Sequence, residues 1–240
     1  MRYVLMLLLL PLLQQAYCED KPVKKKAEYS ASVSLNSNGI ASIPAFSLGK
    51  PALIASLSVA KGRFSYDPVL AYSLNMKPWF FDSWLHYKII DKPSFQLRTG
   101  FNFSNFFTQQ DYSGEMITKG ERYFAGEIAA FYRTGQYNTL SLMYWSDNGM
   151  EPGSISGHYL SFADDVVNVP AGRSVLLGAS LQIFYIGYEG NNDGLFTSPK
   201  LTAGLRNVPV SVFFQATQVI FSNIEPNPGF KWNIGAGYSF

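Results

Sequence analysis

The two histidines of the chain, His86 and His158, are its only imidazole bases. Hydrolysis by a serine needs the hydroxyl within hydrogen-bond reach of such a base, and a third group that orients the base. Ser156 and His158 are two positions apart, so their side chains share one face of an extended strand. This pair is the best candidate for catalysis, with Asn148 as a candidate third group. His86 shares its face with Asp82 and has no evident serine nucleophile.

Charged side chains recur at alternate positions of otherwise apolar segments, and in a strand this spacing gathers them on one face. Asp67 and Asp82 are expected beside Arg98 in an ion-pair network, because buried charges must be paired. Two distant histidines do not make a ligand cluster, so neither a metal nor another cofactor is expected. The charged face carries Asp67, Asp82, His86, Lys88, Arg98, Glu127, Arg133, Lys200, Arg206 and Lys231.

The carboxy-terminal segment shows the alternation most clearly. Counting back from Phe240 by twos gives apolar or aromatic residues, with small or polar residues between them: Tyr238, Ala236, Ile234, Trp232 and Phe230. The segment resembles the closing strand and terminal sorting signal of outer-membrane β-barrels of Gram-negative bacteria. The resemblance implies contact with outer-membrane lipid, and recognition by the barrel-assembly machinery through the strand that ends at Phe240.

The amino-terminal segment 1–18 has the pattern of a secretory signal peptide, which would direct export. A basic residue precedes the apolar run Tyr3–Leu13, which is too short for a membrane-spanning helix of about 20 residues. The small residues Ala16 and Cys18 predict cleavage after Cys18. The alternative is attachment of a lipid to Cys18, which the bulky Tyr17 before it disfavours. Residues 19–27 would form a periplasmic leader. Its short basic run and the net charge of +2 do not indicate a nucleic-acid surface.

Residues 28–240 predict an all-β fold, a single antiparallel transmembrane β-barrel of about twelve strands. Apolar residues make up 47% of the chain, yet they are dispersed as alternation rather than gathered in long runs. The expected strands are 28–36, 52–60, 63–74, 78–90, 94–105, 121–133, 136–146, 155–164, 174–188, 197–206, 209–221 and 229–240.

The predicted connections alternate in length, as short periplasmic turns and longer outer loops do. Tight turns are expected at 61–62, 91–93, 134–135 and 207–208, and longer loops at 37–51, 106–120, 147–154, 189–196 and 222–228. The connection 165–173 is long where a short one is expected. The region 36–52 is ambiguous. Asn36–Gly39 is a hairpin signal, and Ile40–Ser47 after it could form a thirteenth strand, an awkward number for a bacterial barrel. The preferred interpretation is either a long first strand with a bulge near Gly39 or a loop folded into the barrel.

The face opposite the charges is apolar and is expected to contact lipid. Trp79 and Phe81 are assigned to it, as are His158, Leu160 and Phe162. An Arg or Lys on this face would cost about 2–4 kcal/mol at mid-bilayer, and none falls on it in the predicted register. The absence supports the assignment of faces.

The sequence favours a passive channel for small solutes, with the basic surplus of the inner face favouring anions. Two alternatives stay open. One is a non-conducting structural barrel that binds partners through 106–120 or 165–173, and the other is an interfacial lipid hydrolase using Ser156 and His158. Outer-membrane lipid hydrolases imply the order His-x-Ser, whereas this chain has Ser-x-His.

Two further resemblances bear on the channel. The segment 46–52 resembles one in small, functionally uncharacterised outer-membrane proteins. The length and expected strand number are similar to those of small monomeric porins that admit acidic oligosaccharides. Neither resemblance identifies the solute.

Overall fold

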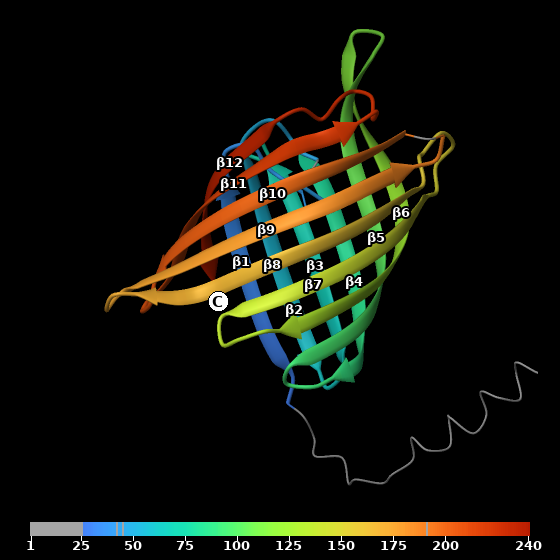
Figure 1. The fold of residues 1–240 in the computed structure, drawn as a ribbon. Helices are drawn as coiled ribbons and strands as arrows, with labels where there is room; N and C mark the ends of the chain where they lie inside the picture. The colour runs from blue at the N-terminus through green and yellow to red at the C-terminus, as the bar shows by residue number, and fades with distance from the viewer. Residues whose placement is uncertain (1–25, 42, 45, 191) are drawn as a thin grey trace, which may run out of the picture.

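The computed structural model describes residues 26–41, 43–44, 46–190 and 192–240. They form a closed antiparallel barrel in which each strand pairs with its neighbours along the chain and the last pairs with the first (Figure 1). The strands are β1 (Glu28–Asn36), β2 (Ala52–Lys61), β3 (Phe64–Ser73), β4 (Pro78–Asp91), β5 (Phe95–Tyr112), β6 (Glu115–Arg133), β7 (Asn138–Gly149), β8 (Gly157–Ala171), β9 (Val175–Tyr188), β10 (Asn192–Leu205), β11 (Val208–Ser222) and β12 (Lys231–Ser239).

This architecture confirms the all-β prediction and the number of twelve strands. The predicted signal peptide 1–18, and all but the last two residues of the predicted leader 19–27, lie outside the described residues. Within the part of the chain that the structure describes, no helix has the length and hydropathy needed to cross a bilayer.

The alternation of side chains gives the barrel an apolar outer surface and an inner surface that carries buried polar groups as well as apolar clusters. A soluble protein would hide such a continuous apolar belt, whereas a bilayer solvates it. Polar groups buried on the inner side include Asn102, Glu127, Ser161, Ser198 and Asn233. Exposed apolar side chains on the outer side include Leu57, Leu70, Leu85, Phe101, Leu142, Phe162, Leu181, Leu201, Val212, Phe214 and Ile234.

The prediction that Trp79 faces outward is wrong. Tyr72 pairs with Pro78 and Ala71 pairs with Phe80, so Trp79 is the extra residue of a β-bulge. The bulge turns consecutive aromatic side chains to the inner side, where Trp79 is 3% and Phe80 is 5% exposed. Their rings pack edge to face at 4.8 Å. Phe81 is only partly exposed.

The predicted loop 106–120 is also wrong, because β5 and β6 continue as a two-stranded arm beyond the barrel (Figure 1, green). Their pairing runs without interruption to Tyr112 and Glu115. The arm extends beyond the barrel, so its sequence does not alternate between a lipid-facing and a lumen-facing side. Its composition is therefore that of a loop, which is why the sequence predicts a loop here. At its base, Arg122 Nε lies 2.6 Å from Glu151 Oε1. Hydrogen bonds from the Arg122 backbone N–H and guanidinium hold the pKa of Glu151 below its usual value.

The predicted long connection 165–173 is wrong for a different reason. β8 runs on to Ala171, and a register shift between Val166 and Val169 accommodates an irregular stretch. Asn168 lies within it with φ of 58°. Single-sequence patterning fails at such a bulge, because one extra residue inverts the alternation beyond it. The β8–β9 connection is therefore a tight turn, like the others at this end of the barrel.

Candidate functional site

The segment 37–51, between β1 and β2, folds into the barrel, so the inward loop is the correct alternative. It begins at the seam of the barrel, where Asn233 of β12 is 1% exposed. The side-chain oxygen of Asn233 accepts a hydrogen bond from the Asn38 backbone N–H at 3.1 Å, and its amide donates to Asn36 Oδ1 at 2.8 Å. Asn38 Nδ2 donates to the Trp232 carbonyl at 2.7 Å. These bonds fix the direction in which the segment enters the lumen.

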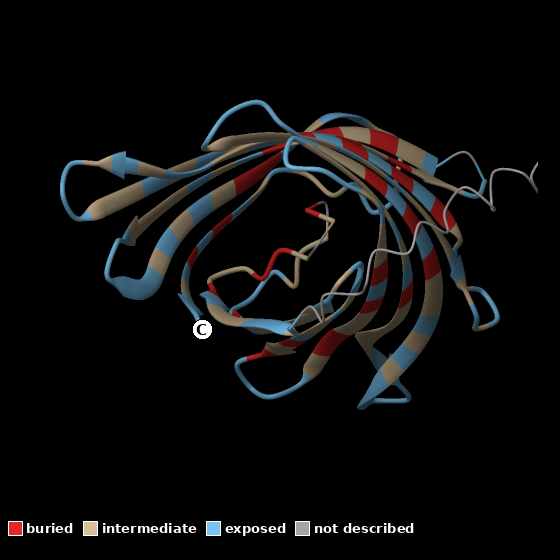
Figure 2. Cartoon of the chain, turned by 90° about the horizontal axis from the view of Figure 1, so that it is seen from below, coloured by how far each residue is buried: buried red, intermediate tan, exposed pale blue. Residues whose placement is uncertain are grey.

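The segment reaches opposite walls of the barrel. Ala41 and Leu48 pack against a buried cluster made of Ala52, Ala71, Trp79 and Phe80, on β2 to β4. Ile43 packs against a second cluster made of Tyr159, Phe184, Ile186 and Phe196, on β8 to β10. In the cyclic order of twelve strands, β3 and β9 are diametrically opposed. The segment therefore crosses the lumen, and the view along the barrel shows chain inside the ring of strands (Figure 2).

A cavity of about 780 Å³ occupies the lumen beside this segment. Ile40, Ala41 and Pro44 of the segment contribute to its lining. Of the described residues that line it, only Asp165 and Lys200 are charged. The remaining polar lining consists of hydroxyl and amide groups: Ser32, Ser34, Asn36, Ser56, Asn168, Ser180, Gln182, Ser198, Thr202, Ser211, Gln215 and Ser239.

Lys200 is held against the cavity wall by an aromatic ring. Its Nζ lies 4.7 Å from the centroid of Phe213. Phe213 lies over Gly235, where an added Cβ would stand 2.3 Å from the ring and 2.7 Å from the Leu35 carbonyl oxygen. Gly235 therefore sets the position of Phe213 and, through it, that of Lys200.

We expect Gly235→Ala to lower the free energy of unfolding by about 1–3 kcal/mol, since the methyl group meets backbone as well as ring atoms. Urea unfolding of the protein in lipid vesicles measures this change. Gly237→Ala is the matched control, because its Cβ would stand no closer than 3.5 Å to its neighbours. Equal stability of the two variants would contradict the assigned role of Gly235.

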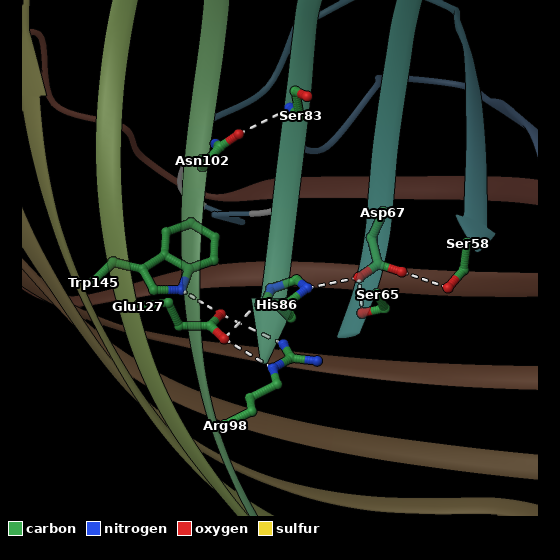
Figure 3. Close-up of polar contacts among 9 residues, drawn as sticks. All are labelled: Ser58, Ser65, Asp67, Ser83, His86, Arg98, Asn102, Glu127 and Trp145. Carbon is green, nitrogen blue, oxygen red and sulfur yellow. Dashed lines mark hydrogen bonds and ion pairs between the residues drawn. The ribbon is translucent and has the colours of Figure 1, made fainter. Parts of the chain in front are cut away.

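The other side of the lumen contains a network of charged side chains (Figure 3). His86 Nδ1 lies 2.6 Å from Asp67 Oδ2, and its Nε2 lies 3.6 Å from Glu127 Oε1. Glu127 also accepts hydrogen bonds from Arg98 Nε at 2.8 Å and from Trp145 Nε1 at 2.9 Å. Its side chain is 1% exposed. The network thus pairs the charges of the β3 to β6 wall with one another.

Strand register explains why these groups meet. His86 pairs with Gly100, Gly100 with Glu127, and Glu127 with Trp145, so all four lie in one row across β4 to β7. A Cβ on Gly100 would stand 2.5 Å from His86 Cδ2. Glycine at this position therefore allows the imidazole to lie over β5 and approach Glu127.

The prediction that Asp67 and Asp82 lie beside Arg98 is wrong, because each of the three side chains has a different partner. Arg98 pairs with Glu127, and Asp67 with His86. Asp82 lies four residues before His86 on β4, level with Ser104, from which it accepts a hydrogen bond at 2.6 Å. The sequence places all of these side chains on the inner face. It does not determine the height along the barrel axis at which each one lies, and so does not determine which of them meet.

The other predicted lumen residues lie outside this network. Lys88 is 3.8 Å from Asp91, near the β4–β5 turn. Arg133 and Arg206 are exposed close to the turns at this same end. Lys231 pairs in register with Thr217, at the opposite end of β12 from its last residue. The sequence pattern does not identify Asp165 as a lumen residue, because it predicts 165–173 as a connection, whereas Asp165 lies within β8.

The candidate hydrolase pair is not assembled. His158 is exposed on the outer face, as expected, together with Leu160 and Phe162. Its Nδ1 hydrogen-bonds the Tyr144 hydroxyl at 2.8 Å, and the two rings stack at 5.9 Å. The Ser156 carbonyl accepts a bond from the Glu189 N–H. The geometry gives His158 a tyrosine partner in place of a serine nucleophile.

We expect wild type, Ser156→Ala and His158→Ala to release fatty acid from phospholipid vesicles at the rate of protein-free vesicles. The reason is that the imidazole bonds Tyr144 instead of Ser156. A fatty-acid assay on refolded protein measures this. Turnover by wild type that Ser156→Ala abolishes would restore the hydrolase hypothesis.

Comparison with protein-family profiles and with curated proteins finds no match. Among solved structures, the chain is similar to the KdgM porin in complex with disordered oligogalacturonate, with a TM-score of 0.59 and 10% identity over 88% of this chain and 99% of that one. It is also similar to the COG4313 outer membrane channel from Pseudomonas putida F1, with a TM-score of 0.56 and 11% identity over 92% and 97% of the two chains. At these identities the likeness shows the fold alone, a closed antiparallel β-barrel like those of these outer-membrane proteins.

Proposed function

We propose that this protein is a passive channel of the bacterial outer membrane for small polar solutes, narrowed by the segment 37–51. The observation that carries the proposal is the cavity of about 780 Å³ inside the barrel, whose lining includes twelve neutral hydroxyl and amide side chains among apolar ones. A purely structural barrel has no need of a polar lumen of this size, because side chains can fill a small barrel. A solute that sheds water on entry can regain hydrogen bonds from such walls.

The proposal includes the route to the membrane and its lipid environment. Export would follow the predicted signal peptide, and the barrel-assembly machinery would recognise the strand that ends at Phe240. The Phe240 backbone N–H closes the barrel by bonding the Ala31 carbonyl at 2.8 Å, while its side chain is 75% exposed. An exposed terminal aromatic side chain fits both the lipid interface and recognition by another protein.

The alternative is a non-conducting structural barrel, and one observation favours it. The segment 37–51 is held at both walls by buried clusters, which is what a permanent plug would require. Its partner surface would be the arm of β5 and β6, since 165–173 is strand and turn rather than a long loop.

Single-channel recording of refolded residues 19–240 in a planar bilayer separates the two. We expect discrete, steady conductance steps. Insertion without conductance, with the barrel shown to be folded by its heat-dependent gel mobility, would contradict the channel and support the structural role.

A further inference from the structure

The lining of the cavity also indicates which solutes pass, an inference that rests on the proposed channel function. We propose that the channel selects small, uncharged, hydroxyl-rich solutes of the sugar and polyol class over ions of either sign. The cavity combines many neutral hydrogen-bonding groups with a pair of opposite charges.

Neutral polar side chains recur along the cavity wall on β1 and on β8 to β12, among apolar ones. Ser180, Lys200, Gln215 and Asn233 lie in one row across β9 to β12. The Ser198 hydroxyl accepts bonds from Gln215 Nε2 and Thr217 Oγ1, both at 3.2 Å. Ser198 and Gln215 line the cavity and form a connected hydroxyl and amide surface, which the buried Thr217 supports from within the wall. Such a surface can exchange hydrogen bonds with a solute that carries hydroxyl groups on every side.

The two charges of the cavity oppose each other. Asp165 pairs with Ser180, and Ser180 pairs with Lys200, so acid and base lie in the same row, two strands apart. Strands are about 4.8 Å apart, which places the two backbones about 10 Å from one another. An ion in the cavity therefore meets one attractive and one repulsive charge at similar distance. As a result, neither anions nor cations are stabilised by this pair.

The lumenal charges on the wall from β3 to β6 are already engaged. Arg98 and Glu127 are paired, as are His86 and Asp67, and Asp82 accepts hydrogen bonds from Ser104 and Asn102. The expected anion preference depended on an excess of basic residues on the inner face. Of these, Arg98 is paired within the wall, and Lys88, Arg133 and Arg206 lie near the turns. An ion entering the cavity would lose hydration without a matching gain in charge pairing, which is unfavourable.

Three linear six-carbon solutes of similar size test the proposal: sorbitol, which is neutral, gluconate, which is anionic, and protonated N-methylglucamine, which is cationic. Flux of each labelled solute is measured across proteoliposomes in potassium chloride, which balances charge. We expect sorbitol to pass faster than both ions. Faster passage of gluconate or of N-methylglucamine would overturn the inference while leaving a channel. Flux of none of the three above protein-free vesicles would contradict the channel itself.

Charge-removing variants give a second readout. Lys200→Gln leaves Asp165 unopposed and should shift the chloride-to-potassium permeability ratio about sevenfold towards potassium. A unit charge about 7 Å from the ion changes the permeability of each ion about 2.7-fold in a water-like medium, in opposite directions for chloride and potassium. Asp165→Asn should shift it by a similar factor towards chloride. The double variant should return to the wild-type ratio. Single variants that leave the ratio unchanged would show that these groups do not act on the solute path and would overturn the inference.

Discussion

Deletion of Ile40–Leu48 is expected to raise the single-channel conductance severalfold and to admit larger sugars. The deleted residues are those that cross the lumen and contribute to the lining of the cavity. The ends are already in contact, because the Asn38 carbonyl accepts a hydrogen bond from the Gly49 N–H at 3.1 Å and the Gly39 carbonyl accepts one from Leu48 at 2.8 Å. Joining Gly39 to Gly49 therefore leaves a short turn above an intact barrel.

The matched control shortens the arm of β5 and β6 instead. Removing Thr108–Asp111 together with Met116–Lys119 keeps the turn at Ser113 and Gly114 and the side-chain alternation, since equal even numbers leave both strands. This variant removes a similar length of chain from outside the barrel and should conduct like wild type. Unchanged conductance in the segment deletion would mean that solutes do not pass this part of the lumen.

Replacing Glu127 by Leu is expected to lower the free energy of unfolding by about 3–5 kcal/mol, the cost of leaving a buried charge without its partner. The carboxylate is 1% exposed and bonds both Arg98 and Trp145, with His86 Nε2 at 3.6 Å. Leucine fills similar space but removes the acceptor that Arg98 and Trp145 use. Urea unfolding in lipid vesicles measures the change.

Two companion variants show whether burial is the cause. Glu127→Gln keeps an acceptor for Trp145 and should cost less than leucine. Glu121→Gln removes a carboxylate from the arm, where its partner Lys119 is 40% exposed, and should change stability by about 0–1 kcal/mol. A Glu127→Leu variant as stable as Glu121→Gln would contradict the structural role of the network.

The sequence by itself determined the class of the fold, the number of strands and the face of nearly every strand. Alternation with period two is a local property, since it depends only on each side chain pointing opposite to the next. It therefore placed Leu181, Val212 and Ile234 outside and Asp67, Glu127 and Lys200 inside. The same pattern failed at Trp79 and beyond Val166, where a bulge inserts a residue that no local signal announces.

Only the tertiary structure decided which inner groups meet. Register between strands sets the height of each side chain, and register is a property of pairs of strands rather than of one strand. This is why Arg98 meets Glu127 instead of Asp82, and why Asp165 and Lys200 share a row. The path of 37–51 was likewise undetermined, because its apolar residues pack on walls formed by strands far away in sequence. Closure of the barrel brings those walls together and makes the cavity between them.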